Sequence, residues 1–458
     1  MVYLIFLPLI TSLISLVKIR ALLPQKLMLI IMPLIGAYLS LKIDVNHSFM
    51  HHIFGIKYEP IGRSFAIFLN IMWLMTNLYA IGYKKQKEYT TNQFKKLTSL
   101  ISLSVFWAQI AAIATNSVII VFCYEMLTIT TFFLVNFDKT PESFRGARKY
   151  FKILMASSIG MLVPFIILLN VSLENADFAK LVANNYKSFV LLLLVFGASK
   201  NAIFPLSSWL NAAMVAPIPV SGLLHAVAVV NTGIIIVLKF YVYIIGFSLP
   251  HDVLGDVIKI AAIITIFLPA IQTLRTDDIK SILAYSTISQ LGIVMFGMLT
   301  LPKDKFLAEI VICQLFAHGM AKIILFFSAG EFYYLRKTYN LNDYHNMIKQ
   351  NPIIVAIFII AALSIVGMPP FIGFYTKSAM IMSEVNHVNQ LILIASSGAS
   401  LLYFIKIFGK IGSFKSEDFK YDKVKVLSFT RLSIVSCFIL LISVSYFSKE
   451  IVVFLWNK

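Results

Sequence analysis

The feature that most constrains the fold is the regular return of long apolar runs along the whole chain. These runs reach the roughly 17 to 25 residues that cross a bilayer as a helix, and they recur about every 20 to 35 residues. Only 13% of the residues are charged, against roughly 25% in soluble domains, and 59% are hydrophobic. We therefore predict an all-α polytopic membrane protein that forms one membrane domain with about 14 transmembrane helices.

The charges between the predicted spans indicate the topology. The predicted spans are residues 2–18, 27–43, 61–83, 97–114, 116–136, 149–171, 187–210, 216–244, 256–273, 280–301, 305–331, 352–382, 389–412 and 428–448. The connections on one side sum to roughly +14, and those on the other side to roughly −1. Since positive connections stay in the cytoplasm, both termini are predicted outside a bacterial inner (plasma) membrane. This topology explains the net charge of +18 without a nucleic-acid partner.

Two predicted spans contain helix-breaking residues near their middle. Pro205 interrupts span 187–210, and Pro369 with Pro370 interrupts span 352–382. The two spans lie five apart, and an odd separation reverses the direction through the membrane, which indicates two inverted five-helix repeats with helices 7 and 12 broken. The predicted units are residues 1–96 (helices 1–3), 97–244 (helices 4–8), 256–412 (helices 9–13) and 428–448 (helix 14).

A lysine at bilayer depth precedes the first break. Lys200 lies inside a long apolar run, with no carboxylate nearby in the sequence. A charge at the bilayer centre costs on the order of 2.5 to 3.5 kcal/mol on insertion scales, so such a residue is expected in an ion or proton path. Glu125, in span 116–136, is the candidate partner, because a carboxylate beside a lysine stays ionised whereas an isolated buried one is neutral. The alternative is a solvated carboxylate at a helix end.

The later spans contain a second set of ionisable groups. His318 and Lys322 are four residues apart and share one face of span 305–331. Histidine can carry a proton near neutral pH and a desolvated lysine can lose one, so the two predict a proton relay. A structural histidine, with Lys322 extending to the membrane surface, is the alternative. Lys377 follows the second break and lies either at membrane depth or near the far interface.

Three further groups have simpler explanations. His225 opens span 216–244 and, taken alone, is more often a packing histidine than a relay. Lys239 and Lys406 lie near predicted helix ends, where lysines commonly extend to the membrane surface.

The sequence contains no other pattern that indicates chemistry. Cys123, Cys313 and Cys437 lie far apart inside apolar runs, which argues against disulfides and metal sites. There is no glycine-rich phosphate loop, no metal-ligand cluster and no nucleophile with a base and an orienting acid. We therefore expect the chain to bind no cofactor, no metal ion and no nucleotide.

Five segments resemble one known family in the family's order. They are Tyr124-Glu125-Met126, residues 199–226 (SKNAIFPLSSWLNAAMVAPIPVSGLLHA), 278–290 (DIKSILAYSTISQ, which contains Lys280), 318–326 (HGMAKIILF) and 367–377 (GMPPFIGFYTK). The family comprises proton-conducting antiporter-like subunits. It includes the large membrane subunits of respiratory NADH-quinone oxidoreductase (complex I) and the Mrp-type sodium/proton antiporter subunits.

The resemblance implies a 14-helix fold and a polar axis along the membrane midplane. In that family, a glutamate of span 5 pairs with a lysine of span 7, and lysine or histidine in spans 8, 11 and 12 continues the axis. Carried over by position, the ion path would consist of Glu125, Lys200, His318, Lys322 and Lys377, with His225, Asn231 and Lys280 in secondary places. Asn231 stands where many members have a lysine, so the first half of the path lacks one proton carrier. Residues 223–230 (LLHAVAVV) look most similar to the D-type subunits of Mrp antiporters.

Taken together, the sequence predicts a subunit that translocates protons within an assembly of other membrane subunits, with Na+ as the candidate exchanged cation. The runner-up is a membrane-arm subunit of complex I, in which partner subunits transfer the electrons. The alternative from another class is a non-transporting structural subunit, and Asn231 motivates it.

Overall fold

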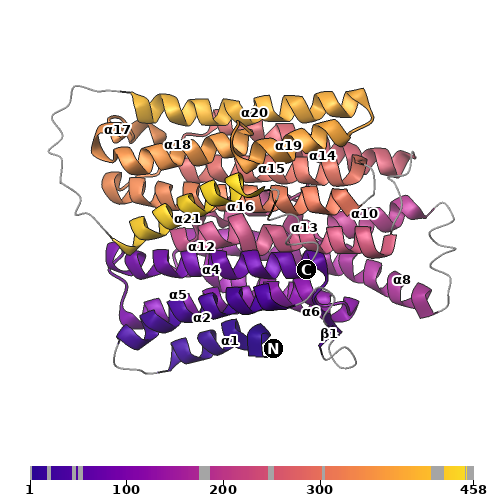
Figure 1. Ribbon diagram of the computed structural model, residues 1–458, viewed down its shortest axis with the longest axis horizontal. Coiled ribbons are helices and arrows are strands. Elements are labelled where there is room, and N and C mark those ends of the chain that lie inside the picture. Colours follow the sequence, from indigo (N-terminus) through magenta and orange to yellow (C-terminus); the bar gives the residue numbers. More distant parts are fainter. Residues whose placement is uncertain are drawn as a thin grey trace.

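The protein is a bundle of long helices that lie side by side, with their connections at the two ends of the bundle (Figure 1). The structure is a computed structural model that describes residues 3–17, 22–43, 48–49, 55–174, 186–245, 252–301, 305–413, 428–448 and 450. Within these residues, one short antiparallel hairpin joins β1 (Ser48–Phe49) to β2 (Ile56–Lys57), with Phe49 opposite Ile56.

The helices follow the predicted spans. The first half contains α1 (Tyr3–Leu16), α2 (Leu22–Lys42), α4 (Pro60–Gln86), α5 (Thr91–Ile113), α6 (Ser117–Val135), α7 (Pro141–Ser157), η1 (Ser158–Leu162), α8 (Val163–Glu174), α10 (Lys187–Gly197), η2 (Ser199–Asn201), α11 (Ser208–Ala212), η3 (Ala213–Val215), α12 (Ile218–Leu223), η4 (Leu224–Ala228), α13 (Val229–Phe240) and η5 (Tyr241–Ile245). The second half contains α14 (Val253–Arg275), α15 (Ile279–Thr300), α16 (Lys305–Arg336), η6 (Leu341–Asp343), α17 (Met347–Gln350), α18 (Pro352–Val366), α19 (Ile372–Ser383), α20 (His387–Gly412) and α21 (Phe429–Tyr446).

Ten helical stretches of the described residues are long and apolar enough to cross a membrane. Four further apolar helices are shorter, and three of these lie in predicted spans that a break or a π-helical turn divides: 187–210, 216–244 and 352–382. The prediction of an all-α polytopic membrane protein is therefore confirmed.

Both predicted breaks are present, and local chemistry explains them. The first separates α10 from α11, and Pro205, which has no backbone N–H to donate, lies inside it. The second separates α18 from α19. There Gly367 ends α18 with a φ of 91°, a left-handed conformation that favours glycine, and Pro369 and Pro370 follow.

Two helical hairpins of the chain, α5–α6 and α14–α15, are built alike. α5 and α14 each contain 23 residues, and three residues separate each from the helix that follows. The N-cap residues correspond as well: Asp252 lies 162 residues after Thr90, and Asp278 lies 162 residues after Asn116. In all four caps the side-chain oxygen accepts a hydrogen bond from a backbone N–H of the first turn.

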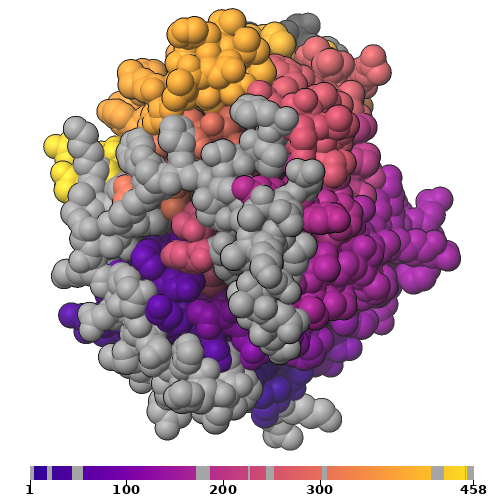
Figure 2. All heavy atoms as spheres, turned by 90° about the vertical axis from the view of Figure 1, so that its right-hand side faces the viewer, coloured from indigo at the N-terminus to yellow at the C-terminus, as the bar shows by residue number. Residues whose placement is uncertain are grey.

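The centre of the bundle is formed by α15 and α16, which are buried on almost all sides, whereas α2, α20 and α21 keep one broad face exposed. Seen towards one end of the helices, the first helices (indigo) and α20 (orange) lie on opposite sides, while α21, the last described helix, packs against α4 (Figure 2). Residues from both halves of the chain therefore meet at the central helices. Buried polar groups there need partners within the protein, because the membrane offers none.

Candidate functional site

Lys200 is buried beside the first helix break and is bound by α6. It belongs to η2 and has no exposed surface. Its ammonium donates hydrogen bonds to the carbonyl oxygen of Tyr124 (2.9 Å) and to Oγ1 of Thr128 (2.6 Å), and it lies 3.0 Å from the centre of the Tyr124 ring. Tyr124 and Thr128 are one helical turn apart, so a single face of α6 forms the lysine's binding site.

Glu125 does not form the expected direct ion pair with Lys200. Neighbouring residues on a helix point about 100° apart, so Glu125 turns away from the face that carries Tyr124. The half-buried Glu125 carboxylate accepts a hydrogen bond from the Ser158 hydroxyl instead. It remains within electrostatic reach of Lys200.

Ser157 and Ser158, which we call the serine bridge, lie between Glu125 and Ser199, the residue before Lys200. Ser157 and Ser158 are neighbours at the point where α7 passes into the π-helical turn η1. Ser158 donates to Glu125, while the Ser157 hydroxyl is hydrogen-bonded to that of Ser199, the residue before Lys200. At this π-helical turn, a feature that often marks functional sites, Ser158 contacts Glu125 and Ser157 contacts the neighbour of Lys200.

Helix α13 covers the same lysine from another side. A Cβ atom at Gly233 would lie 2.5 Å from the backbone nitrogen of Asn201 and 2.7 Å from the carbonyl carbon of Lys200, so only glycine allows this approach. Asn231, two residues earlier, is fully buried on α13. His225 belongs to η4, but its side chain lies outside the described residues.

The second group of buried polar residues lies on α16. Gln314, His318 and Lys322 are spaced four apart and are all almost fully buried. The Lys322 ammonium donates to the carbonyl oxygen of Leu283 at 3.0 Å and to the hydroxyl of Ser286, both on α15. Neither ring nitrogen of His318 has a hydrogen-bond partner among the described residues, although the ring lies within electrostatic reach of Lys322 and Lys377.

Lys377 is bound across the second helix break. It is 5% exposed, so its side chain lies in the interior of the protein. Its ammonium donates to the carbonyl oxygens of Ile365 (2.7 Å) and Val366 (3.2 Å), the last two residues of α18. Carbonyls at the end of a helix accept no hydrogen bond from within that helix. Thr376, the preceding residue, donates to Gln314 and so connects α19 to α16.

The two like hairpins hold lysines at corresponding places. Ser286, which binds Lys322, lies 162 residues after Tyr124, which binds Lys200. The lysines themselves come from different helices, since Lys200 follows α10 and Lys322 lies on α16. Each lysine bonds only to neutral oxygens, and no ion pair among the described residues involves Lys200, Lys322 or Lys377.

The remaining predicted residues lie away from these lysines. Lys280 is buried at the start of α15 and donates to the carbonyl oxygen of Ala216 at 2.7 Å, so it anchors the turn before α12. Pro369 and Pro370 are exposed. Pro205 is also exposed and lines a cavity of about 270 Å³ at the first break, together with Lys149, Asn211, Gln272 and Tyr285.

Sequence reasoning missed several of the polar partners. Thr128, Ser157, Ser158, Ser286 and Gln314 each contact a predicted residue or its neighbour. Thr128 lies one turn after the motif residue Tyr124, and Ser286 lies inside the motif 278–290, and these positions were the available signal. Ser157 and Ser158 gave no such signal in the sequence, because hydroxyls inside apolar helices usually bond to their own backbone.

The Thr128 hydroxyl provides a first prediction. Thr128→Val keeps the side-chain shape but removes one acceptor from Lys200, and a hydrogen bond to a charged group is worth about 1.5 to 3 kcal/mol. We expect about a tenfold slower ion flux with normal assembly, measured as initial rates in vesicles. Thr130→Val is the matched control, since within the described part of the chain the Thr130 hydroxyl bonds only to the Met126 carbonyl of its own helix. A full rate from Thr128→Val would contradict the role given to this hydroxyl.

The fold and the site define a class of protein. Helices long enough to span a bilayer enclose a row of buried lysines, a histidine and a carboxylate, and two of the lysines lie at helix breaks. Among the described residues, no group of three histidine, cysteine or acidic side chains could hold a metal ion. The chain is an integral membrane protein with ionisable groups buried among its helices.

The chain belongs to the NADH:quinone oxidoreductase/Mrp antiporter transmembrane family, whose sequence model matches residues 114–402. This confirms the resemblance found in the motifs.

Individual relatives agree with this family. The chain is 28% identical over 352 residues to NADH-ubiquinone oxidoreductase chain 5 of Paramecium tetraurelia, covering 72% of this chain and 58% of the relative. It is 27% identical over 368 residues to Na(+)/H(+) antiporter subunit A1 of Staphylococcus haemolyticus, covering 75% of this chain and 45% of the relative. The chain thus spans about half the length of the curated relatives it matches.

A solved structure shares the fold. A chain of the membrane-bound sulfane sulfur reductase, an archaeal respiratory membrane complex, superposes with a TM-score of 0.81 over 99% of this chain and 96% of its own, at 18% identity.

Proposed function

We propose that the protein is a subunit that translocates protons and monovalent cations within a multi-subunit assembly of a bacterial inner membrane. The observation that carries this proposal is that Lys200, Lys322 and Lys377 are buried and, among the described residues, bonded to neutral oxygens only. Burial penalises the charged form of a lysine, and a neutral acceptor requires no compensating charge when the proton leaves. Such groups can release and regain protons.

The proposed path runs along the row of buried groups. It begins at Glu125 and passes the serine bridge to Lys200, continues past Asn231 to Lys322 and His318, and ends at Lys377. The cavity at the first break supports access from the surface, because polar side chains line it and it is large enough for water. At Asn231 the path has no titratable side chain, so water would carry the proton there.

The proposed architecture is 14 transmembrane helices with two inverted repeats, residues 97–244 and 256–412. The constant separation of 162 residues between the caps of α5–α6 and those of α14–α15 supports the repeat. Helices five apart enter the membrane from opposite sides, so the second repeat would be inverted. Both termini would then lie outside.

The relatives support two kinds of assembly. Similarity to the Staphylococcus antiporter protein supports an Mrp-type cation/proton antiporter with Na+ as exchanged ion, while similarity to chain 5 supports a complex I membrane arm. We propose the first, and within it the role of a D-type subunit, which residues 223–230 indicate. In either case the partners are other membrane subunits, and this chain itself binds no nucleotide.

The test is to purify the assembly through this chain, identify its companions and reconstitute it into vesicles. We expect proton movement, followed with a pH-sensitive dye, when a Na+ gradient is applied. Companions that are all small membrane proteins would favour the antiporter, and flavin or iron–sulfur proteins would favour complex I. An intact assembly that moves no protons, either with a cation gradient or with an electron donor and a quinone, would contradict the proposal.

A further inference from the structure

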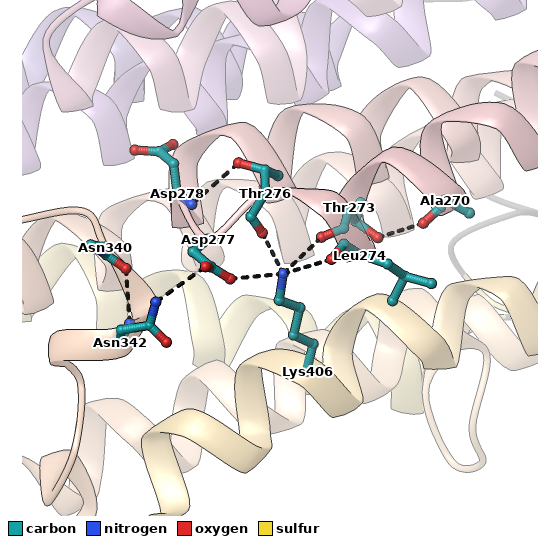
Figure 3. Close-up of polar contacts among 9 residues, drawn as sticks. All are labelled: Ala270, Thr273, Leu274, Thr276, Asp277, Asp278, Asn340, Asn342 and Lys406. Carbon is teal, nitrogen blue, oxygen red and sulfur yellow. Dashed lines mark hydrogen bonds and ion pairs between the residues drawn. The ribbon is translucent and has the colours of Figure 1, made fainter.

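Lys406 is half-buried and forms an interhelical contact between the last and the first helix of the second predicted repeat. We call such a contact between a lysine and the end of another helix a fastening. Lys406 projects from α20, and its ammonium donates to the carbonyl oxygens of Thr273 (3.3 Å), Leu274 (3.1 Å) and Thr276 (2.6 Å) at the end of α14 (Figure 3). It also forms an ion pair with Asp277 at 2.9 Å. The last carbonyls of a helix have no partner within it and carry partial negative charge, so a cation satisfies both needs.

Neighbouring residues keep this fastening in its charged form. Asn342, in η6, donates to the other oxygen of Asp277 at 3.1 Å. The hydrogen bonds from Lys406 and Asn342 hold the pKa of the Asp277 carboxyl below its usual range. Because the pKa is lowered by folding, the contribution of Asp277 is present at neutral pH and is lost only as the pH falls through the lowered value. Asp277 therefore keeps its negative charge at neutral pH.

Lys239 makes the same kind of connection in the first predicted repeat. It projects from α13, and its ammonium donates to the carbonyl oxygens of Ala112 (2.9 Å) and Ala114 (2.6 Å) at the end of α5. The carboxylate of Glu59, the N-cap residue of α4, lies 3.3 Å away. Lys239 is 5% exposed, so it does not extend to the membrane surface as predicted from its position near a helix end.

The helix ends that bind Lys239 and Lys406 occupy corresponding positions. The bound carbonyls of Leu274 and Thr276 lie 162 residues after those of Ala112 and Ala114, the same separation as between the helix caps. Neither lysine takes part in the row of buried groups that the ion path uses. The correspondence between the two fastenings is therefore independent of the ion path.

Each fastened helix also touches the buried lysine of its own half. α13 presses Gly233 against the backbone of Lys200. On α20, Leu393 and Ser396 line the same small space as Lys377, and Ser400 accepts a hydrogen bond from Gln290 of α15 at 2.7 Å. A shift of α13 or α20 would thus change the surroundings of a lysine in the path.

We propose that Lys239 and Lys406 are equivalent positioning residues, which fasten α13 to the end of α5 and α20 to the end of α14, and so hold these helices against Lys200 and Lys377. The effect on transport rests on the proposed function, whereas the effect on helix position does not. Ion flux measures the first effect, and amide hydrogen exchange measures the second.

The experiment uses the whole assembly with Lys406→Met, Lys406→Arg and the matched control Lys410→Met. Lys410 lies one turn further along α20 and within electrostatic reach of Asp277, but no hydrogen bond or ion pair of its side chain is present among the described residues, so it controls for the loss of one positive charge near that carboxylate. Amide hydrogen exchange in the last turn of α14 and the facing part of α20 is expected to rise roughly tenfold in Lys406→Met, since hydrogen bonds to a charged group are lost. Flux is expected to fall roughly tenfold, because small displacements at a reacting group are costly. Lys406→Arg should restore both, and Lys410→Met should change neither.

The same measurements apply to Lys239→Met, read out at the ends of α5 and α13. Since that change leaves the largely buried Glu59 without its cation, the double variant Lys239→Met/Glu59→Gln is made as well. Unchanged exchange in Lys406→Met and in the Lys239 double variant would overturn the proposal. Lost flux with unchanged exchange would also overturn it and would make Lys406 an ion carrier. Absent flux in the wild-type assembly would contradict the proposed function, and exchange would still decide the fastening.

Discussion

Replacing Lys200 by methionine is expected to lower proton flux through this subunit by about 10²-fold or more, the usual contribution of a group that transfers a proton. Methionine fills similar space, so the helices around the site should pack and assemble normally. Lys200→Arg makes the prediction sharper. Arginine keeps the charge and can donate to Tyr124 and Thr128, but it does not lose its proton in proteins.

Flux is measured in vesicles with a pH-sensitive dye, and both variants are expected to be inactive. Lys152→Met, an exposed lysine on α7, is the control for loss of one positive charge. If Lys200→Arg retained full flux, Lys200 would be needed for its charge alone, and its role as a proton carrier would be disproved.

Replacing Gly233 by alanine is expected to destabilise the protein by about 3 kcal/mol or more, because the added Cβ meets backbone atoms that cannot move aside. Helix propensity alone predicts the opposite, since alanine is about 1 kcal/mol better than glycine in a helix. The difference in sign makes this a strict test of the contact between α13 and Lys200. Thermal unfolding of the assembly, followed by size-exclusion chromatography after heating, is the measurement.

The matched control is Gly398→Ala on α20, where an added Cβ would meet nothing within 4 Å. That variant should be as stable as the wild type or slightly more stable. Equal stability of Gly233→Ala and Gly398→Ala would show that α13 does not lie as close to Lys200 as described.

The sequence was sufficient for the fold class and for the burial of two of the charged residues. Apolar runs give the spans because only helices satisfy the backbone inside a membrane. Pro205 and the pair Pro369–Pro370 indicated the breaks, because proline removes a backbone donor. Lys200 and Lys377 stood out because a charge at bilayer depth is costly, and both are indeed buried.

The partners of these residues could not be predicted in the same way. The choice between Glu125 and the backbone of Tyr124 as the neighbour of Lys200 depends on the rotation of α6, which an apolar helix does not reveal in its sequence. Lys377 and Lys406 bond to main-chain carbonyls, and such acceptors are present at every residue. Position along the chain alone made Lys239 look like a surface anchor, whereas the end of α5 binds it in the interior.

The most direct test of the central claim, that this chain conducts ions along its buried lysines, is the flux of an assembly with Glu125→Gln and Lys200→Met together. A structural subunit would tolerate both changes, since neither alters side-chain volume much. We predict an assembly with the same companions and yield as the wild type, and a flux at least 10²-fold lower through this subunit. Wild-type flux from the fully assembled double variant would contradict the claim and would make the chain a non-transporting structural subunit.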